Sequence, residues 1–214
     1  MHVVRGKQLT PLTGDDLAAL RAPFAHVVVD MGTGDGRAAY RLARARPDTL
    51  VVGVDPAWER MVETATRGAR KPAKGGLPNI LFVRGVAEDP PVELLGLADE
   101  VQVAMPWGRL LAGVVRGDPD VCGGLRALAT TGATLEVTVG TDIWREPVPL
   151  EIRPLPELTV SYVDSFLRSA LAATGWRVER AESLPASSAG TSWARRLSGG
   201  RPDSRFFQLA AVAG

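Results

Sequence analysis

Residues 27–36 of the chain, VVVDMGTGDG, predict its fold. The β-branched run 27–29 is typical of a buried parallel strand, and it ends on the carboxylate of Asp30. Three glycines follow at alternate positions, where they allow a tight turn and a close approach of a ligand to the backbone. Residues 37–45 have a helical pattern, so the turn opens a helix N-terminus. A strand, a glycine turn and a helix form half of a nucleotide-binding unit.

The acid and the glycine spacing favour a cationic ligand over a dinucleotide. The dinucleotide fingerprint is G-x-G-x-x-G, whose pyrophosphate rests on the helix N-terminus. Here the third glycine comes one residue early, and Asp30 would repel a pyrophosphate. A carboxylate suits the positive groups of S-adenosylmethionine, and D-x-G-x-G-x-G resembles the first motif of the class I methyltransferases. The alternative is a strand-to-helix turn that binds nothing or binds another nucleotide.

Length and composition exclude several other classes of protein. The 214 residues suffice for one domain with a single core, and 45% apolar and 23% charged residues are ordinary for a globular protein. A net charge of +1 means that any nucleic-acid surface must be a local patch. We expect a cytoplasmic protein without membrane contact, because there is neither a signal peptide nor an apolar run of about 18 residues.

Cysteine and histidine are too rare for several kinds of site. The one cysteine, Cys122, excludes an internal disulfide and a cysteine-rich zinc site, and we expect it to be buried filler in a helix. The chain has two histidines, which argues against a histidine-based metal site or catalytic triad. We therefore expect no metal.

The remaining pattern predicts a doubly wound α/β sheet of seven strands, with a helix after each of the first five and the last strand antiparallel. Residues 1–12 are expected to form a hairpin cap, and about 140–160 and 184–204 to form long loops. The expected strands are 26–30, 50–55, 80–84, 100–105, 134–139, 176–182 and 205–212. The expected helices are 13–21, 36–46, 57–67, 109–115, 119–129 and 161–173.

Ligand-binding candidates follow the expected strands at one edge of the sheet. Asp55 lies about 20 residues after the glycine turn, where a carboxylate can bind two ribose hydroxyls, although it can also cap the next helix. Pro56 suits the first turn of that helix. Ala87 and Glu88 follow the third strand, where such folds hold an adenine ring, although Glu88 can equally be a surface acid.

Aromatic and basic residues in loops indicate a nucleic-acid substrate. We expect Trp58 and Trp176 in the core. Trp107, Trp144 and Trp193 lie in loops, where an indole can stack on a nucleobase or anchor its own loop. The expected loop at 67–78 carries four positive charges and no acid.

A methyl donor beside such residues suggests methylation of a base that is flipped out of its helix. Enzymes that methylate exocyclic amines usually place Asn or Asp before proline and an aromatic residue at the end of the fourth strand. Here Met105, Pro106 and Trp107 lack that acceptor. A ring nitrogen with a free lone pair needs no general base, only alignment with the methyl group.

Four segments together resemble the aminoglycoside-resistance 16S rRNA methyltransferases, and within them the branch that methylates N1 of adenine 1408. These are DMGTGDG at 30–36, KPAKGGLPN at 71–79, MPWG at 105–108 and TSW at 191–193. The resemblance implies a Rossmann-like fold and a monomer that acts on the assembled 30S subunit. The added methyl group and positive charge would block aminoglycoside binding.

The resemblance also implies roles for particular residues. S-adenosylmethionine would lie against Asp30, Gly32, Gly34, Asp55, Pro56, Ala87, Glu88, Met105 and Pro106. Trp107 and Trp193 would sandwich the flipped adenine, with Ser192 helping to hold the site. Phosphates of the rRNA would meet Arg67, Arg70, Lys71, Lys74, Arg196 and Arg205. The whole chain, 1–214, would be a single methyltransferase domain.

Two other functions remain open from the residues themselves. A small-molecule methyltransferase on the same fold would have an apolar lid over the donor and would not need the basic loop. A non-catalytic binder of RNA or nucleotide would have no affinity for the donor.

Overall fold

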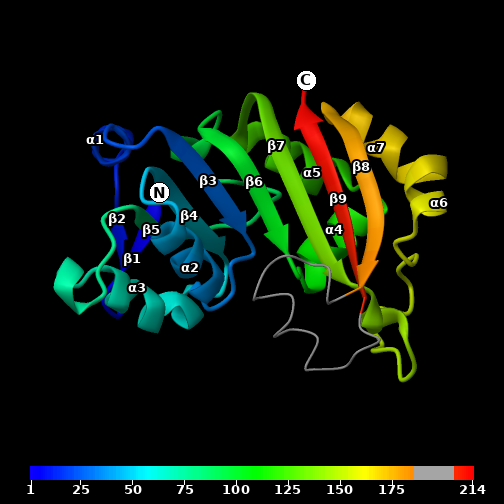
Figure 1. Ribbon diagram of the computed structural model, residues 1–214, viewed down its shortest axis with the longest axis horizontal. Coiled ribbons are helices and arrows are strands. Elements are labelled where there is room, and N and C mark those ends of the chain that lie inside the picture. The colour runs from blue at the N-terminus through cyan, green and yellow to red at the C-terminus, as the bar shows by residue number, and fades with distance from the viewer. Residues whose placement is uncertain (186–204) are drawn as a thin grey trace.

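The computed structural model describes residues 1–185 and 205–214. Within them, nine strands form one mixed sheet in the order β2-β1-β5-β4-β3-β6-β7-β9-β8 (Figure 1). The strands are β1 (His2–Arg5), β2 (Gln8–Pro11), β3 (His26–Met31), β4 (Thr49–Asp55), β5 (Ile80–Arg84), β6 (Ala98–Ala104), β7 (Ala129–Gly140), β8 (Trp176–Pro185) and β9 (Arg205–Ala213).

The expected count of seven strands is wrong by two, because the N-terminal hairpin joins the sheet. Strands β1 and β2 form the predicted hairpin, and β1 pairs antiparallel with β5 through Val3 and Val83. Val3 is fully buried, so its apolar side chain extends the core to this edge. The other seven strands are those predicted, and β9 lies antiparallel between β7 and β8 as expected.

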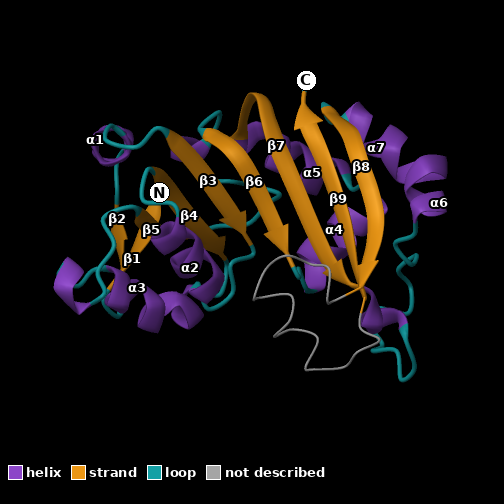
Figure 2. Cartoon of the chain, viewed as in Figure 1, coloured by secondary structure: helices purple, strands orange, loops and turns teal. Residues whose placement is uncertain are grey.

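Helices cover both faces of the sheet (Figure 2). On one face, α2 and α3 enclose a small core that includes Val28, Val51 and Phe82. On the other face, α1, α4, α5 and α7 pack on the larger core. The α-helices are α1 (Gly14–Arg21), α2 (Arg37–Ala45), α3 (Val62–Gly68), α4 (Gly108–Arg116), α5 (Pro119–Leu128), α6 (Val160–Tyr162) and α7 (Arg168–Ala173).

Three expected helices differ from prediction. The expected helix 161–173 is divided into α6 and α7 by a π-helical turn at 163–167. The expected helix 57–67 is divided into the 3-10 turn η1 (Trp58–Met61) and α3. After β5 there is no α-helix but only the 3-10 turn η3 (Val92–Leu94), so the expectation of a helix after each of the first five strands is wrong. Pro90 and Pro91 explain this, because proline lacks the N–H that a helix needs and disfavours helical geometry in the residue before it.

The remaining short elements lie near the site or in the long connection. They are η2 (Pro72–Lys74), η4 (Thr141–Trp144) and the π-helical turn η5 (Val163–Leu167), which joins α6 to α7. No helix among the described residues combines the length and apolar character needed to cross a bilayer.

Of three residues expected in the interior, two are fully buried. Trp176 is 1% exposed and Cys122 lies buried in α5, as expected. Burial raises the pKa of the Cys122 thiol to about 12, which makes it inert as a nucleophile. Trp58 is only half-buried, at the margin of the smaller core.

The sheet brings the segments after four parallel strands to one edge. Strand β3 pairs in parallel with β4 on one side and with β6 on the other. The connections therefore leave in opposite directions on either side of β3, and such a switch point opens a crevice at the carboxyl ends of the strands. The segments that follow β3, β4, β5 and β6 contribute residues to this crevice.

Candidate functional site

The turn after β3 requires its glycines. Gly32, Gly34 and Gly36 have φ angles of 75°, 62° and 73°, which L side chains rarely adopt. Space is also limited, since a Cβ on Gly32 would lie 2.6 Å from Leu110 and one on Gly36 would overlap the ring of Phe82. Because these glycines have no side chains, a ligand in the crevice can approach the backbone before α2 closely.

Asp30 places a buried negative charge beside this turn. Its side chain is 3% exposed, and its Oδ2 accepts a hydrogen bond of 2.6 Å from the Thr33 hydroxyl. Burial raises the pKa of Asp30 to about 6, opposed by the Thr33 hydrogen bond and assisted by the charge of Asp55. A carboxylate in this environment is stabilised by a cation.

Asp55, at the end of β4, holds two backbone segments together. Its Oδ2 accepts from the N–H of Gly34 at 2.9 Å, and its Oδ1 accepts from the N–H of Ala57 at 2.8 Å. The bond to Ala57 stabilises the turn before η1 and is not a helix cap, because neither η1 nor α3 receives a side-chain cap. Asp55 also borders the main cavity, so its remaining lone pairs can accept hydroxyl groups of a ligand.

The crevice contains a cavity of about 530 Å³, within the usual range for small-molecule sites. Its wall is mainly apolar, with Asp55 and Glu88 as the acids. Glu88 forms an ion pair of 2.5 Å with Arg109, so its carboxylate already has a partner. The lining residues are Met31, Gly32, Gly34, Asp55, Pro56, Ala57, Arg60, Val86, Ala87, Glu88, Met105, Trp107, Gly108, Arg109 and Leu110.

A second recess, of about 360 Å³, lies on the other side of the glycine turn. Asp30 borders this recess and not the main cavity, while Gly32, Gly34 and Met105 border both. An elongated ligand with a cationic end can therefore span the turn. S-adenosylmethionine fits this arrangement. The apolar wall suits its adenine base, Asp55 suits its ribose, and the buried Asp30 suits its ammonium group.

The end of β6 presents an indole to the crevice. Met105 has a φ of 51°, and this left-handed residue redirects the chain away from the sheet. Pro106 is buried and does not line the cavity, in contrast to its neighbours. Trp107 is 52% exposed at the N-cap of α4. An exposed indole at a cavity rim is suited to stacking.

The other loop tryptophans are not equivalent to Trp107. Trp144 packs at the margin of the larger core, and its Nε1 donates a hydrogen bond of 3.2 Å to the carbonyl of Leu155. It therefore anchors its own loop. Trp193, Ser192 and Arg196 lie outside the described residues.

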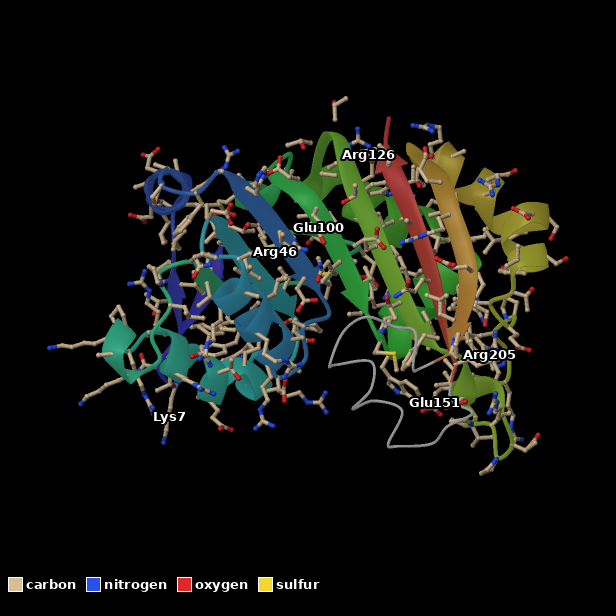
Figure 3. The ribbon with its side chains drawn as sticks, viewed as in Figure 1. Lys7, Arg46, Glu100, Arg126, Glu151 and Arg205 are labelled. Atoms are coloured by element: carbon tan, nitrogen blue, oxygen red, sulfur yellow. The ribbon has the colours of Figure 1, made fainter. Side chains whose placement is uncertain are left out.

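Most of the expected RNA-binding cations lie together at the end of α3. Arg67, Arg70, Lys71 and Lys74 are exposed between α3 and β5. The Arg67 guanidinium lies 4.6 Å from the centre of the Tyr40 ring. Arg205 is separate from them, at the start of β9, where its Nε donates to the Ser183 hydroxyl at 3.1 Å (Figure 3).

Several residues around the two hollows were not predicted. Arg109 and Leu110 line the cavity from the first turn of α4, and Arg60 from η1. Arg37 and Arg41 border the recess from α2. Arg37 directly follows Gly36 and Arg109 directly follows Gly108, and this adjacency is the signal that the sequence carries for them. Arg41 and Arg60 have no such neighbour.

Comparison with known proteins agrees with this geometry. Residues 2–212 match the family model described as NpmA, 16S rRNA (adenine(1408)-N(1))-methyltransferase. A protein of that name from Streptoalloteichus hindustanus is 39% identical, over 98% of this chain and 97% of its own.

Two solved structures are also similar. A variant of the enzyme of that name from Catenulisporales acidiphilia, with cosubstrate SAM, has a TM-score of 0.91 and 53% identity, covering 99% of this chain and 96% of its own. The aminoglycoside resistance methyltransferase NpmB1 has a TM-score of 0.87 and 35% identity, with both chains covered fully at 100%. The chain therefore belongs to the family of 16S rRNA (adenine(1408)-N(1))-methyltransferases.

Proposed function

We propose that this chain transfers a methyl group from S-adenosylmethionine to N1 of adenine 1408 in 16S rRNA. The observation that carries the proposal is the cavity at the β3–β6 switch point, with the exposed Trp107 at its rim and a buried acid behind the glycine turn. Family membership over residues 2–212 supports the choice of reaction.

The chain's residues would bind and align the reactants. Asp30 would face the donor's ammonium group and Asp55 its ribose, while Gly32, Gly34, Pro56, Ala87, Glu88 and Met105 would surround the rest. Pro106, which does not line the cavity, would connect Met105 to Trp107. When bound, S-adenosylmethionine supplies an electrophilic methyl group and leaves as S-adenosylhomocysteine. Adenine N1 carries a free lone pair in the plane of its ring. No side chain has to remove a proton, so alignment is the chain's main contribution.

The base would be held outside its helix. An adenine paired or stacked in rRNA cannot reach the cavity, so it must be flipped. We propose that Trp107 stacks on one face of the adenine and Trp193 on the other, with Ser192 nearby. The exposed cations Arg67, Arg70, Lys71, Lys74 and Arg205, together with Arg196, would contact rRNA phosphates.

The substrate would be the assembled 30S subunit, and the enzyme would act as a monomer with residues 1–214 in one domain. Cations spread over a wide surface suit a folded RNA rather than a short single strand. Methylation of N1 adds a positive charge and a methyl group to the base. That change would confer aminoglycoside resistance by blocking hydrogen bonds of the drug.

Methyl transfer to purified 30S subunits tests the proposal. The protein, radiolabelled S-adenosylmethionine and 30S subunits are incubated, and primer extension then locates the modified base. We expect a stop at adenine 1408 and little transfer to free 16S rRNA. A stop elsewhere would refute the assigned target. Labelling of small molecules alone would favour a small-molecule enzyme, and no calorimetric heat with the donor would favour a non-catalytic binder.

A further inference from the structure

A groove lies between residues of α2 and α3. Both helices cover the same face of the sheet (Figure 1). It measures about 440 Å³ and is lined by Arg37, Tyr40, Arg41, Arg44, Glu63, Thr64 and Arg67. Four of these seven residues are arginines, although the chain as a whole has a net charge of only +1. Positive charge is therefore concentrated locally.

Not all of this charge is neutralised. Arg37 forms ion pairs with Asp35 at 3.4 Å and with Glu63 at 3.5 Å. Among residues 1–185 and 205–214, Arg41 and Arg44 form no ion pair and no side-chain hydrogen bond. The spacing of Arg41 and Arg44 places both on one side of α2. Two guanidinium groups thus face an open groove with their donors available.

The groove is continuous with both parts of the proposed site. At one end, Arg41 also borders the recess that contains Asp30 and Met105. At the other end, Arg67 lies against Tyr40, whose hydroxyl donates a hydrogen bond of 2.6 Å to the carbonyl of Gly75 in the basic loop. A line of cations therefore runs from the glycine turn to the loop.

We propose that this groove binds a second stretch of the rRNA backbone, with Arg41 and Arg44 on its phosphates. This inference rests on the proposed function and assigns it a further substrate contact. A guanidinium group offers paired donors that match phosphate oxygens. An open groove with separated cations suits successive phosphates of a chain better than one small anion. The contact would position the subunit while the basic loop holds another segment.

The test compares Arg41→Ala/Arg44→Ala with Arg21→Ala. Arg21 is an exposed arginine on α1, which covers the opposite face of the sheet, and it forms no ion pair among the described residues. Binding of 30S subunits is measured by fluorescence anisotropy at several salt concentrations, and donor binding by calorimetry.

We expect the double variant to bind 30S subunits about tenfold more weakly at low salt, and the slope of log K against log salt to fall by about 2. Donor affinity should stay at the wild-type value in Arg44→Ala, because Arg44 borders the groove but neither the cavity nor the recess. Arg21→Ala should keep both the 30S affinity and the donor affinity of the wild type. Arg41→Lys/Arg44→Lys should keep the salt slope, because it retains both charges.

Wild-type 30S affinity and salt slope in the double variant would overturn the inference, as would an equal loss in Arg21→Ala. The single variant Arg44→Ala controls for misfolding of the double variant. Arg44 is exposed, so its replacement leaves the core unchanged. The proposed function fails separately, if the wild-type protein does not methylate adenine 1408. The salt slope measures groove binding whether or not transfer occurs.

Discussion

Replacing Asp30 with asparagine should stabilise the fold and weaken donor binding. Burial raises the pKa of Asp30 from its ordinary 3.8 to about 6, so the folded protein holds this proton more tightly than the unfolded chain. The stability that the folded state gains from binding this proton is fully present below about pH 4, and it is lost as the pH rises through about 6. Above that pH, the buried negative charge of Asp30 destabilises the folded state.

The pKa difference sets the magnitude. At about 1.4 kcal/mol per pKa unit, a rise from 3.8 to about 6 corresponds to roughly 3 kcal/mol. The asparagine amide would carry no charge, and its carbonyl oxygen can still accept the hydrogen bond from Thr33. For a chain of this size, roughly 3 kcal/mol raises Tm by about 6–12 °C, which is the upper limit of the effect.

Thermal unfolding between pH 5 and pH 8 measures this effect. The gain in Tm of Asp30→Asn over wild type should be largest at pH 8 and should shrink toward pH 5. Asp35→Asn, an exposed acid in the same turn, is the matched control and should change Tm little at either pH. Equal gains at pH 5 and pH 8, or a less stable Asp30→Asn at pH 8, would refute the reasoning.

Calorimetry should show the opposite effect on the donor. Loss of a charged hydrogen-bond partner costs about 1.5–3 kcal/mol, which is a loss of roughly 10- to 100-fold in affinity. In the wild-type protein, donor affinity should fall as the pH drops below about 6, because protonation removes the same charge. Unchanged donor affinity in Asp30→Asn would remove Asp30 from the proposed site.

Three further substitutions test other parts of the site. Trp107→Ala should abolish methyl transfer and leave donor affinity nearly intact, and wild-type transfer rates would show that no stacking role exists. Gly124→Ala should weaken donor binding about tenfold, because its Cβ would overlap the carbonyl oxygen of Ala87 at the cavity wall; Gly123→Ala, which has open space, should not. Lys71→Glu should weaken 30S binding more at low salt than at high salt, and an equal loss throughout would indicate a misfolded loop.

Local patterns along the chain were sufficient for much of the fold. The strands from β3 to β9 follow from apolar runs, and the turn at 32–36 follows from glycines that alone tolerate its positive φ angles. The same turn, with Asp30 before it, was enough to predict a cationic ligand. These features depend on residues close in sequence, where steric and periodic rules apply directly.

Pairing between distant segments was decided only by the tertiary structure. No periodicity indicates that β1 pairs with β5, so the sheet has nine described strands where seven were expected. The two proposed roles of Asp55 and the alternatives for Trp144 were also undecidable from sequence. Asp55 bridges Gly34 and Ala57, and Trp144 reaches Leu155, through contacts that only folding creates.

The placement of charge shows the same division. The sequence alone identified Asp30 as an acid beside a glycine turn and residues 67–74 as a basic segment. Burial, which raises the pKa of Asp30, and the groove shared by Arg41, Arg44 and Arg67 exist only in three dimensions. Periodicity can assign a residue to a face of its own helix, whereas what lies opposite that face depends on how α2 and α3 pack on the sheet.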